Sequence, residues 1–214
     1  MDKKELKKEL ENYEIQMTSA ERSKAYFNGE RVDHLPFNIM SLDVVYGMNM
    51  GYSLKETDNV DNLIKIIERR SKKYKIYGIS EGLNLRAMGY CLGSTGIFPE
   101  NDIDHVDHYL MEDELNMDLL ELPDPYTNEL LKKKLEKARK LREHFPDHPI
   151  STFVAGPIST AVAIRPISKL LRDLRKNPDG VKELIDFCVK ANMAWARAFK
   201  DEFGPVKLMI ADPV

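Results

Sequence analysis

Five polar residues follow the points where the sequence predicts strands to end. Asn38 and Asn84 follow short apolar segments, Ser159 and Thr160 follow a Gly-Pro turn, and Asp212 follows the last apolar segment. In α/β folds, ligands bind at the carboxyl ends of strands, beside helix N-termini whose free N–H groups attract anions. We therefore predict that Asp212 takes part in catalysis and that the other four bind substrate or cofactor.

Each of these residues also has a structural interpretation. A hydroxyl or carboxylate at a helix start accepts hydrogen bonds from backbone N–H groups. Capping therefore explains Ser159 and Thr160 more readily than ligand binding does. For Asp212, a site carboxylate and a turn cap are equally well supported, so both interpretations stay open.

Histidines and cysteines give weaker candidates for a metal or nucleophilic site. His105 and His108 alternate with aspartates, but no third soft ligand is near them, which favours a solvated acidic loop. Cys91 and Cys188 have no evident basic partner that would stabilise a thiolate, which favours buried, inert thiols. No metal ligand is assigned.

The elements that must position these residues follow from apolar runs and turn signals. Residues 150–155 are β-branched and apolar, typical of a buried strand, and the segments 36–40, 82–85 and 206–211 predict three more. Helical patterns separate the four, and long helical connections imply parallel strands. We predict an α/β fold: a partial TIM (β/α)8 barrel of about four parallel strands at 36–214, after an N-terminal helical extension at 1–35.

Other segments have weaker but definite patterns. Residues 89–98 predict an additional β segment, 101–108 an acidic loop and 113–120 a short helix. Asp58 is expected to cap a helix that continues to Tyr74. Further helices are expected at 2–16, 18–28, 125–145, 158–163, 166–176 and 179–203.

Composition restricts the function classes. The 214 residues are 43% hydrophobic and 31% charged, as in ordinary globular proteins. A net charge of −3 argues against nucleic acid or an anionic membrane as the main partner. No apolar run approaches the ~20 residues of a membrane span, and the charged start lacks the apolar centre of a secretion signal. With two distant cysteines, these features predict a cytoplasmic protein.

Several segments, taken in order, resemble the uroporphyrinogen decarboxylase superfamily, especially its methylcobamide (corrinoid) methyltransferase branch. They are MTSAER at 17–22, FNGERVDHLP at 27–36, AMG at 87–89 with IFPEND at 97–102, AGPIS at 155–159, and IADP at 210–213. Each motif is weak alone, and their order and spacing carry the resemblance. It implies a TIM barrel of which this sequence spans about the first half.

The resemblance departs from the decarboxylases themselves. These enzymes are expected to bind carboxylates with paired arginines after the first strand, where this sequence has NIMSLD at 38–43. The decarboxylase tyrosine corresponds to about Ala163. Without guanidinium groups a polycarboxylate has no charge-assisted, bidentate partner, so the methyltransferase branch fits better. A decarboxylase-like enzyme for a smaller acid is the alternative, with Arg86 and Arg165 as the nearby cations.

The methyltransferase branch implies a zinc-bound thiolate that takes a methyl group from a methylcobamide. The implied partners are therefore zinc, a corrinoid protein or free methylcobamide, and a small thiol-type acceptor. The zinc ligands of that branch have no counterpart here, so we expect this chain to supply only the substrate side of a site and to be inactive alone. An open sheet edge favours self-association, and a non-catalytic half-barrel scaffold is the remaining alternative.

Overall fold

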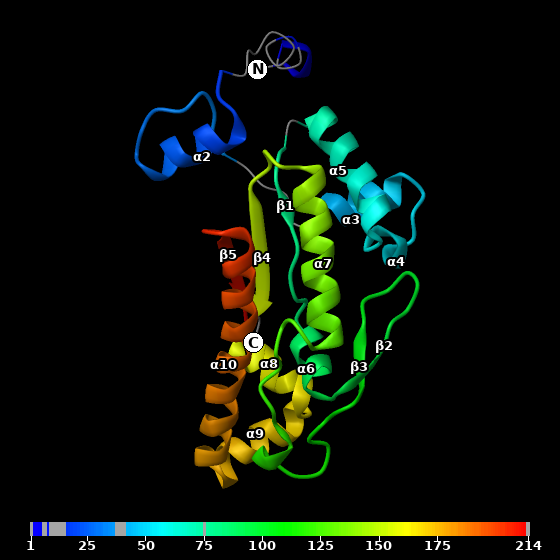
Figure 1. Cartoon of the computed structure of the whole chain (residues 1–214), viewed down its shortest axis with the longest axis vertical. Helices are drawn as coiled ribbons and strands as arrows, with labels where there is room; N and C mark the ends of the chain where they lie inside the picture. The colour runs from blue at the N-terminus through cyan, green and yellow to red at the C-terminus, as the bar shows by residue number, and fades with distance from the viewer. Residues whose placement is uncertain (1, 6–7, 9–15, 37–41, 75, 213–214) are drawn as a thin grey trace.

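The computed structural model describes residues 2–5, 8, 16–36, 42–74 and 76–212. Its elements, shown in Figure 1, are α2 (Ser19–Phe27), α3 (Leu42–Asn49), α4 (Leu54–Thr57), α5 (Val60–Tyr74), β1 (Ile79–Ser80), α6 (Ala87–Leu92), β2 (Thr95–Ile97), β3 (His105–His108), the 3-10 helix η1 (Met117–Leu119), α7 (Glu129–His144), β4 (Ile150–Ala155), α8 (Pro157–Ile164), α9 (Ile167–Lys176), α10 (Pro178–Phe203) and β5 (Lys207–Ala211). No helix in these ranges is long and apolar enough to cross a membrane.

A parallel sheet in the order β1-β4-β5 lies at the centre of the fold. Ile79 of β1 pairs with Ile150 of β4, and Ser151 of β4 pairs with Lys207 of β5. Helices connect these strands, so the sheet confirms the predicted α/β class with parallel strands. The antiparallel pair β2 and β3 forms a separate hairpin.

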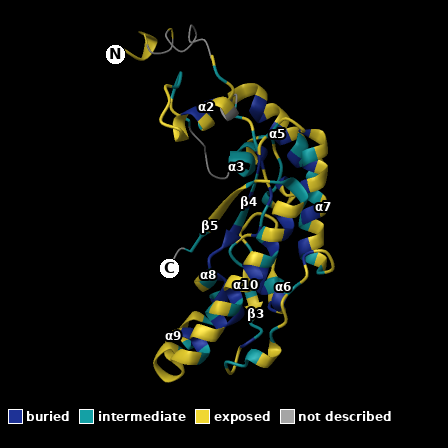
Figure 2. Cartoon of the chain, turned by 60° about the vertical axis from the view of Figure 1, so that its left-hand side comes forward, coloured by how far each residue is buried: buried dark blue, intermediate teal, exposed yellow. Residues whose placement is uncertain are grey.

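The long helices α7 and α10 supply much of the core. The fully buried residues of α7 recur every three or four positions at Leu131, Leu135, Ala138 and Leu141, as expected of an amphipathic helix. Figure 2 shows the same division on α10, with buried residues on one side and exposed residues on the other. Trp195 of α10 is fully buried and donates its indole N–H to Thr152 Oγ1 of β4 at 2.9 Å.

The prediction of a strand at 82–85 is wrong. The strand is β1, at Ile79–Ser80, although two backbone hydrogen bonds beyond it, one of them from Leu83 N–H to Phe153 O, still tie the chain to β4. Gly82 allows this close approach, because a Cβ there would lie 2.5 Å from Phe153 N and 2.6 Å from Phe153 O.

The segment between β1 and α7 also differs from expectation. The expected β segment at 89–98 is the helix α6 followed by the short strand β2, and the expected loop at 101–108 ends in β3. The expected helix at 113–120 is only the 3-10 turn η1. The two strands pair with each other, and the prediction of a loop at 101–108 missed the second of them.

Most of the predicted helices are present. Helices α2, α7, α8, α9 and α10 form close to their expected positions, and Thr18 and Glu21 make the capping box that starts α2. Asp58, however, does not cap α5: the side-chain oxygen of Asn59 accepts from the backbone N–H groups of Asp61 and Asn62. Most of the helix expected at 2–16 and of the strand expected at 36–40 lies outside the described residues.

Candidate functional site

The carboxyl ends of β4 and β5 lie side by side. Ala155 pairs with Ala211, and the next backbone N–H, that of Gly156, donates to Ala211 O at 2.6 Å. The chain then enters α8 after β4, while Asp212 follows β5. The pairing of these strands thus brings Asp212 to the start of α8.

The carboxylate of Asp212 caps α8 from the neighbouring strand. Its Oδ1 accepts from the Ser159 N–H and the Ser159 hydroxyl, both at 2.7 Å, and its Oδ2 accepts from the Ile158 N–H at 3.1 Å. A negative charge is stabilised at a helix N-terminus by the free N–H groups and the helix dipole. A carboxylate offers about four acceptor positions, so Oδ2 keeps capacity for one donor from a ligand.

Gly156 makes room for this carboxylate. A Cβ on Gly156 would lie closer than 3.0 Å to the Cγ, Cβ and Oδ2 atoms of Asp212. Its backbone angles, φ −72° and ψ 168°, are open to any residue. Glycine is therefore needed here for space and not for its backbone freedom.

Thr160 lies behind this turn, fully buried. Its hydroxyl donates to Gly156 O at 3.0 Å and lies 3.0 Å from the Asn192 Nδ2 atom, which also donates to Ala155 O at 3.0 Å. Asn192 of α10 thus holds both the end of β4 and the start of α8. Sequence reasoning missed Asn192; the one available signal was an amide within the inward, otherwise apolar face of α10.

Asn84 belongs to a second polar group, after β1. Its Oδ1 accepts from the backbone N–H groups of Arg86 and Ala87 at 3.0 and 2.8 Å, and its Nδ2 donates to Asp104 Oδ1 at 3.0 Å. The Tyr90 hydroxyl donates to the other oxygen of Asp104 at 2.8 Å. Burial and the Asp104 carboxylate hold the pKa of Tyr90 well above its usual range, so Tyr90 stays a neutral donor. No hydrogen bond between described residues joins Asn84 to Asp212.

The two candidate arginines differ in availability. Arg165 is only 4% exposed; its Nε pairs with the Asp173 carboxylate and its Nη1 donates to Met111 O at 2.9 Å. Its guanidinium group therefore holds α8 to α9 and to the segment before η1. Arg86, beside Asn84, is partly exposed.

The soft metal ligands do not converge. Among described residues, no three His, Cys, Asp or Glu side chains are grouped to hold a metal ion. The imidazole of His108, exposed on β3, contacts its neighbour Asp107 at 2.7 Å. Burial raises the pKa of both Cys91 and Cys188 to about 12, so neither thiol ionises readily. Asn38 lies outside the described residues.

Comparisons with known proteins identify one family and one similar fold. A family model described as Uroporphyrinogen decarboxylase (URO-D) matches residues 18–212. The structure is similar to that of a methyltransferase from Methanosarcina mazei, with a TM-score of 0.69 and 21% identity, over 93% of this chain and 60% of that chain. At this identity the likeness concerns the fold. No curated protein matches.

Proposed function

Because the chain belongs to the uroporphyrinogen decarboxylase family and has the fold of part of its TIM barrel, we propose that it forms one wall of a methyltransferase site. The proposed reaction moves a methyl group from a methylcobamide to a small thiol-type acceptor. A similar fold in a protein named as a methyltransferase supports this class of reaction. The chain spans 60% of that protein, so the whole reaction, its substrates and a corrinoid partner protein are part of the proposal.

The burial of Arg165 is the main observation that favours methyl transfer over decarboxylation of a tetrapyrrole. A tetrapyrrole with several carboxylates needs exposed guanidinium groups for bidentate recognition. Arg165 is the arginine nearest the Gly156–Ser159 turn in sequence. Its guanidinium group already pairs with Asp173 and donates to the Met111 carbonyl. Instead, the carboxyl ends of β4 and β5 present the carboxylate of Asp212, which would repel an anionic substrate.

The proposed role of Asp212 is to position a donor group of the substrate. Ser159 and the start of α8 fix the carboxylate from one side, so a hydroxyl or amide N–H that binds Oδ2 would have a defined orientation. Ser159 acts through Asp212, and Thr160 and Asn192 keep the turn in place. We propose that Asn84, exposed at the end of the next strand, contacts the substrate separately.

The described residues of this chain do not fit a catalytic zinc site. Such a site needs three converging ligands, and no such group exists among the described residues. The raised pKa of both cysteines also opposes thiolate ligation. The arrangement at Asp212 fits the binding of a neutral, donor-bearing substrate group.

Equilibrium dialysis with methylcobalamin tests the proposal. We expect the chain to bind it and Asp212→Ala and Asn84→Ala to weaken binding, whereas Asp61→Ala, at an exposed position of α5, should bind normally. Uroporphyrin, a stable porphyrin with many carboxylates, should not bind. Failure to bind methylcobalamin, or binding that Asp212→Ala and Asn84→Ala leave unchanged, would contradict the proposal.

A decarboxylase-like enzyme for a small acid is the second candidate. It is favoured by the partly exposed Arg86, the N-cap residue of α6, which lies close to Asn84 in the chain. Binding of a small dicarboxylate that is lost in Arg86→Gln but kept in Arg69→Gln, an exposed arginine of α5, would support this candidate over the methyltransferase.

A further inference from the structure

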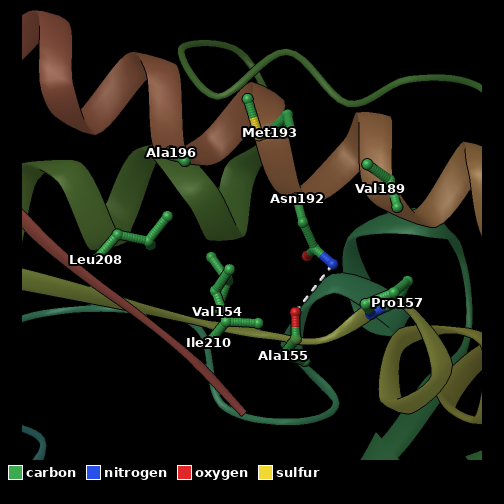
Figure 3. A pocket seen from close by; sticks show the side chains of 9 residues that line it. All are labelled: Val154, Ala155, Pro157, Val189, Asn192, Met193, Ala196, Leu208 and Ile210. Carbon is green, nitrogen blue, oxygen red and sulfur yellow. Dashed lines mark hydrogen bonds between the residues drawn. The ribbon is translucent and has the colours of Figure 1, made fainter. Parts of the chain in front are cut away.

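Two polar groups flank β4 at the carboxyl edge of the sheet, whose strand order is β1-β4-β5. On the β5 side, Asn192 holds the end of β4, as Figure 3 shows, and Asp212 keeps capacity to accept a hydrogen bond. On the β1 side, Asn84 has the corresponding place after its strand. The hydrogen bonds around Asn84 indicate a different preference, for a ligand group that accepts.

The hydrogen bonds of Asn84 leave one donor for a ligand. Its Oδ1 accepts from the backbone N–H groups of Arg86 and Ala87, so both acceptor positions are filled, and these donors distinguish the oxygen of the amide from its nitrogen. One Nδ2 hydrogen goes to Asp104 Oδ1, and the other has no partner among the described residues. Because the side chain is exposed, Asn84 can donate to a ligand but cannot accept from one.

Asp104 places a negative charge beside this donor. Its two oxygens accept from Asn84 Nδ2 at 3.0 Å and from the Tyr90 hydroxyl at 2.8 Å. Neither partner is a cation, so these hydrogen bonds do not neutralise the carboxylate. Since the two N–H bonds of an amide diverge by about 120°, an oxygen bound by the free one would lie about 5 Å from Asp104 Oδ1. At that distance Asp104 repels a carboxylate but not a neutral oxygen.

The loop between β2 and β3 fixes Asp104 in this position. The Tyr90 ring, whose hydroxyl donates to Asp104, packs against Phe98 with 5.2 Å between the ring centroids. In the same loop, Glu100 accepts from the hydroxyl of Ser53, the N-cap residue of α4. The loop is therefore attached to the rest of the fold at two points, and Asp104 supplies a charge of fixed position.

We propose that Asp104 makes the Asn84 position selective for a neutral acceptor, such as the oxygen of a carboxamide, over a carboxylate. Asn84 contacts the ligand, and Asp104 positions Asn84 and sets its charge preference. This inference rests on the proposed function and deepens it. The corrin ring of methylcobalamin carries primary carboxamide side chains, and their oxygens are acceptors of this kind.

Equilibrium dialysis tests the charge preference with methylcobalamin and its monocarboxylic acids, in which one carboxamide is hydrolysed to a carboxylate. Each isomer is measured separately. We expect at least one isomer to bind the chain about tenfold more weakly than methylcobalamin. Asp104→Asn can keep the bonds to Asn84 and Tyr90, because an amide offers both an acceptor and donors, but it removes the charge. It should reduce that difference to about threefold or less.

Two matched variants separate the charge of Asp104 from its structural role. Tyr90→Phe removes the second hydrogen bond to Asp104 and keeps the charge, so the difference between methylcobalamin and the discriminated isomer should persist. Asp102→Asn, at an exposed acid of the same loop, makes the same change of net charge and should also preserve it. Loss of the difference in all three variants would overturn the proposal, because it would assign the effect to the structure of the loop.

The remaining outcomes distinguish this inference from the proposed function. If methylcobalamin does not bind, the proposed function fails, and the charge preference fails with it. If methylcobalamin binds and Asn84→Ala weakens it, yet Asp104→Asn leaves the relative affinity of every isomer unchanged, only this inference fails. Tighter binding of a carboxylate isomer that Arg86→Gln abolishes would also overturn it, because Arg86 would then set the charge preference.

Discussion

Replacing Gly156 with alanine tests whether Asp212 is seated against α8 as described. A methyl group at Gly156 would overlap the Asp212 carboxylate, while the backbone angles suit alanine. The substitution should therefore act by expelling Asp212. Losing a helix cap costs about 0.5–2 kcal/mol, and charge-assisted hydrogen bonds contribute about 1.5–3 kcal/mol each when buried. Because Asp212 is half-buried, we expect Gly156→Ala to lower the free energy of unfolding by about 2 kcal/mol.

The same substitution should cost little once Asp212 is removed. In Asp212→Gly, neither the Cβ nor the carboxylate obstructs the alanine, and alanine stabilises by about 0.4–1 kcal/mol because it restricts the unfolded chain. Because Gly156 is also the N-cap of α8, where glycine is preferred over alanine, the double variant should lie within about 1 kcal/mol of Asp212→Gly. Urea denaturation followed by fluorescence of the single tryptophan measures all four proteins. Additive losses in the double variant would refute the assigned contact.

Three further predictions concern other parts of the chain. Hydrogen bonding to an arginine holds the pKa of Asp33 well below its usual range, so its stabilisation is complete above the unfolded pKa and is lost as pH falls. Acid titration of stability should therefore be shallower in Asp33→Asn, and equal slopes would contradict this. Thr152→Val leaves the Trp195 indole N–H buried without its acceptor and should cost about 1–3 kcal/mol in urea denaturation; an unchanged free energy of unfolding would contradict this hydrogen bond. A thiol reagent at pH 8 should label Cys188 only in denaturant, because its pKa is raised to about 12, and rapid labelling of Cys188 in the native protein would disprove its burial.

Local sequence was sufficient to predict an element where the residues that determine it all lie within one segment. Residues 150–155 form β4 with the predicted boundaries, because an apolar run ends at a Gly-Pro turn. Thr18 and Glu21 contain the whole capping box of α2. The prediction of a strand at 82–85 was wrong. The backbone around Gly82 does contact β4, but it forms no regular ladder of hydrogen bonds with it.

The candidate site was predicted only in outline for the same reason. Asp212 was identified with two alternative roles, and the helix that it caps begins more than 50 residues earlier in the chain. No local pattern links the two. Asn192 was missed because its partners, Ala155 and Thr160, lie on other elements. Ligand contacts of Asn84, Ser159, Thr160 and Asp212 stay predictions.

The pairing of the central sheet constrains when it can form during synthesis. Ile79 pairs with Ile150, so β1 has no partner until β4 has left the ribosome, and β4 in turn waits for β5. Such distant pairing slows folding, because the entropy cost of closing a long loop comes before the stabilising contacts form. Meanwhile the apolar residues Leu63 and Ile67 of α5, which share a core cluster with residues of α7, stay uncovered until α7 is synthesised. Nascent chains should therefore need chaperones, and slower translation between α5 and α7 should lengthen that exposure.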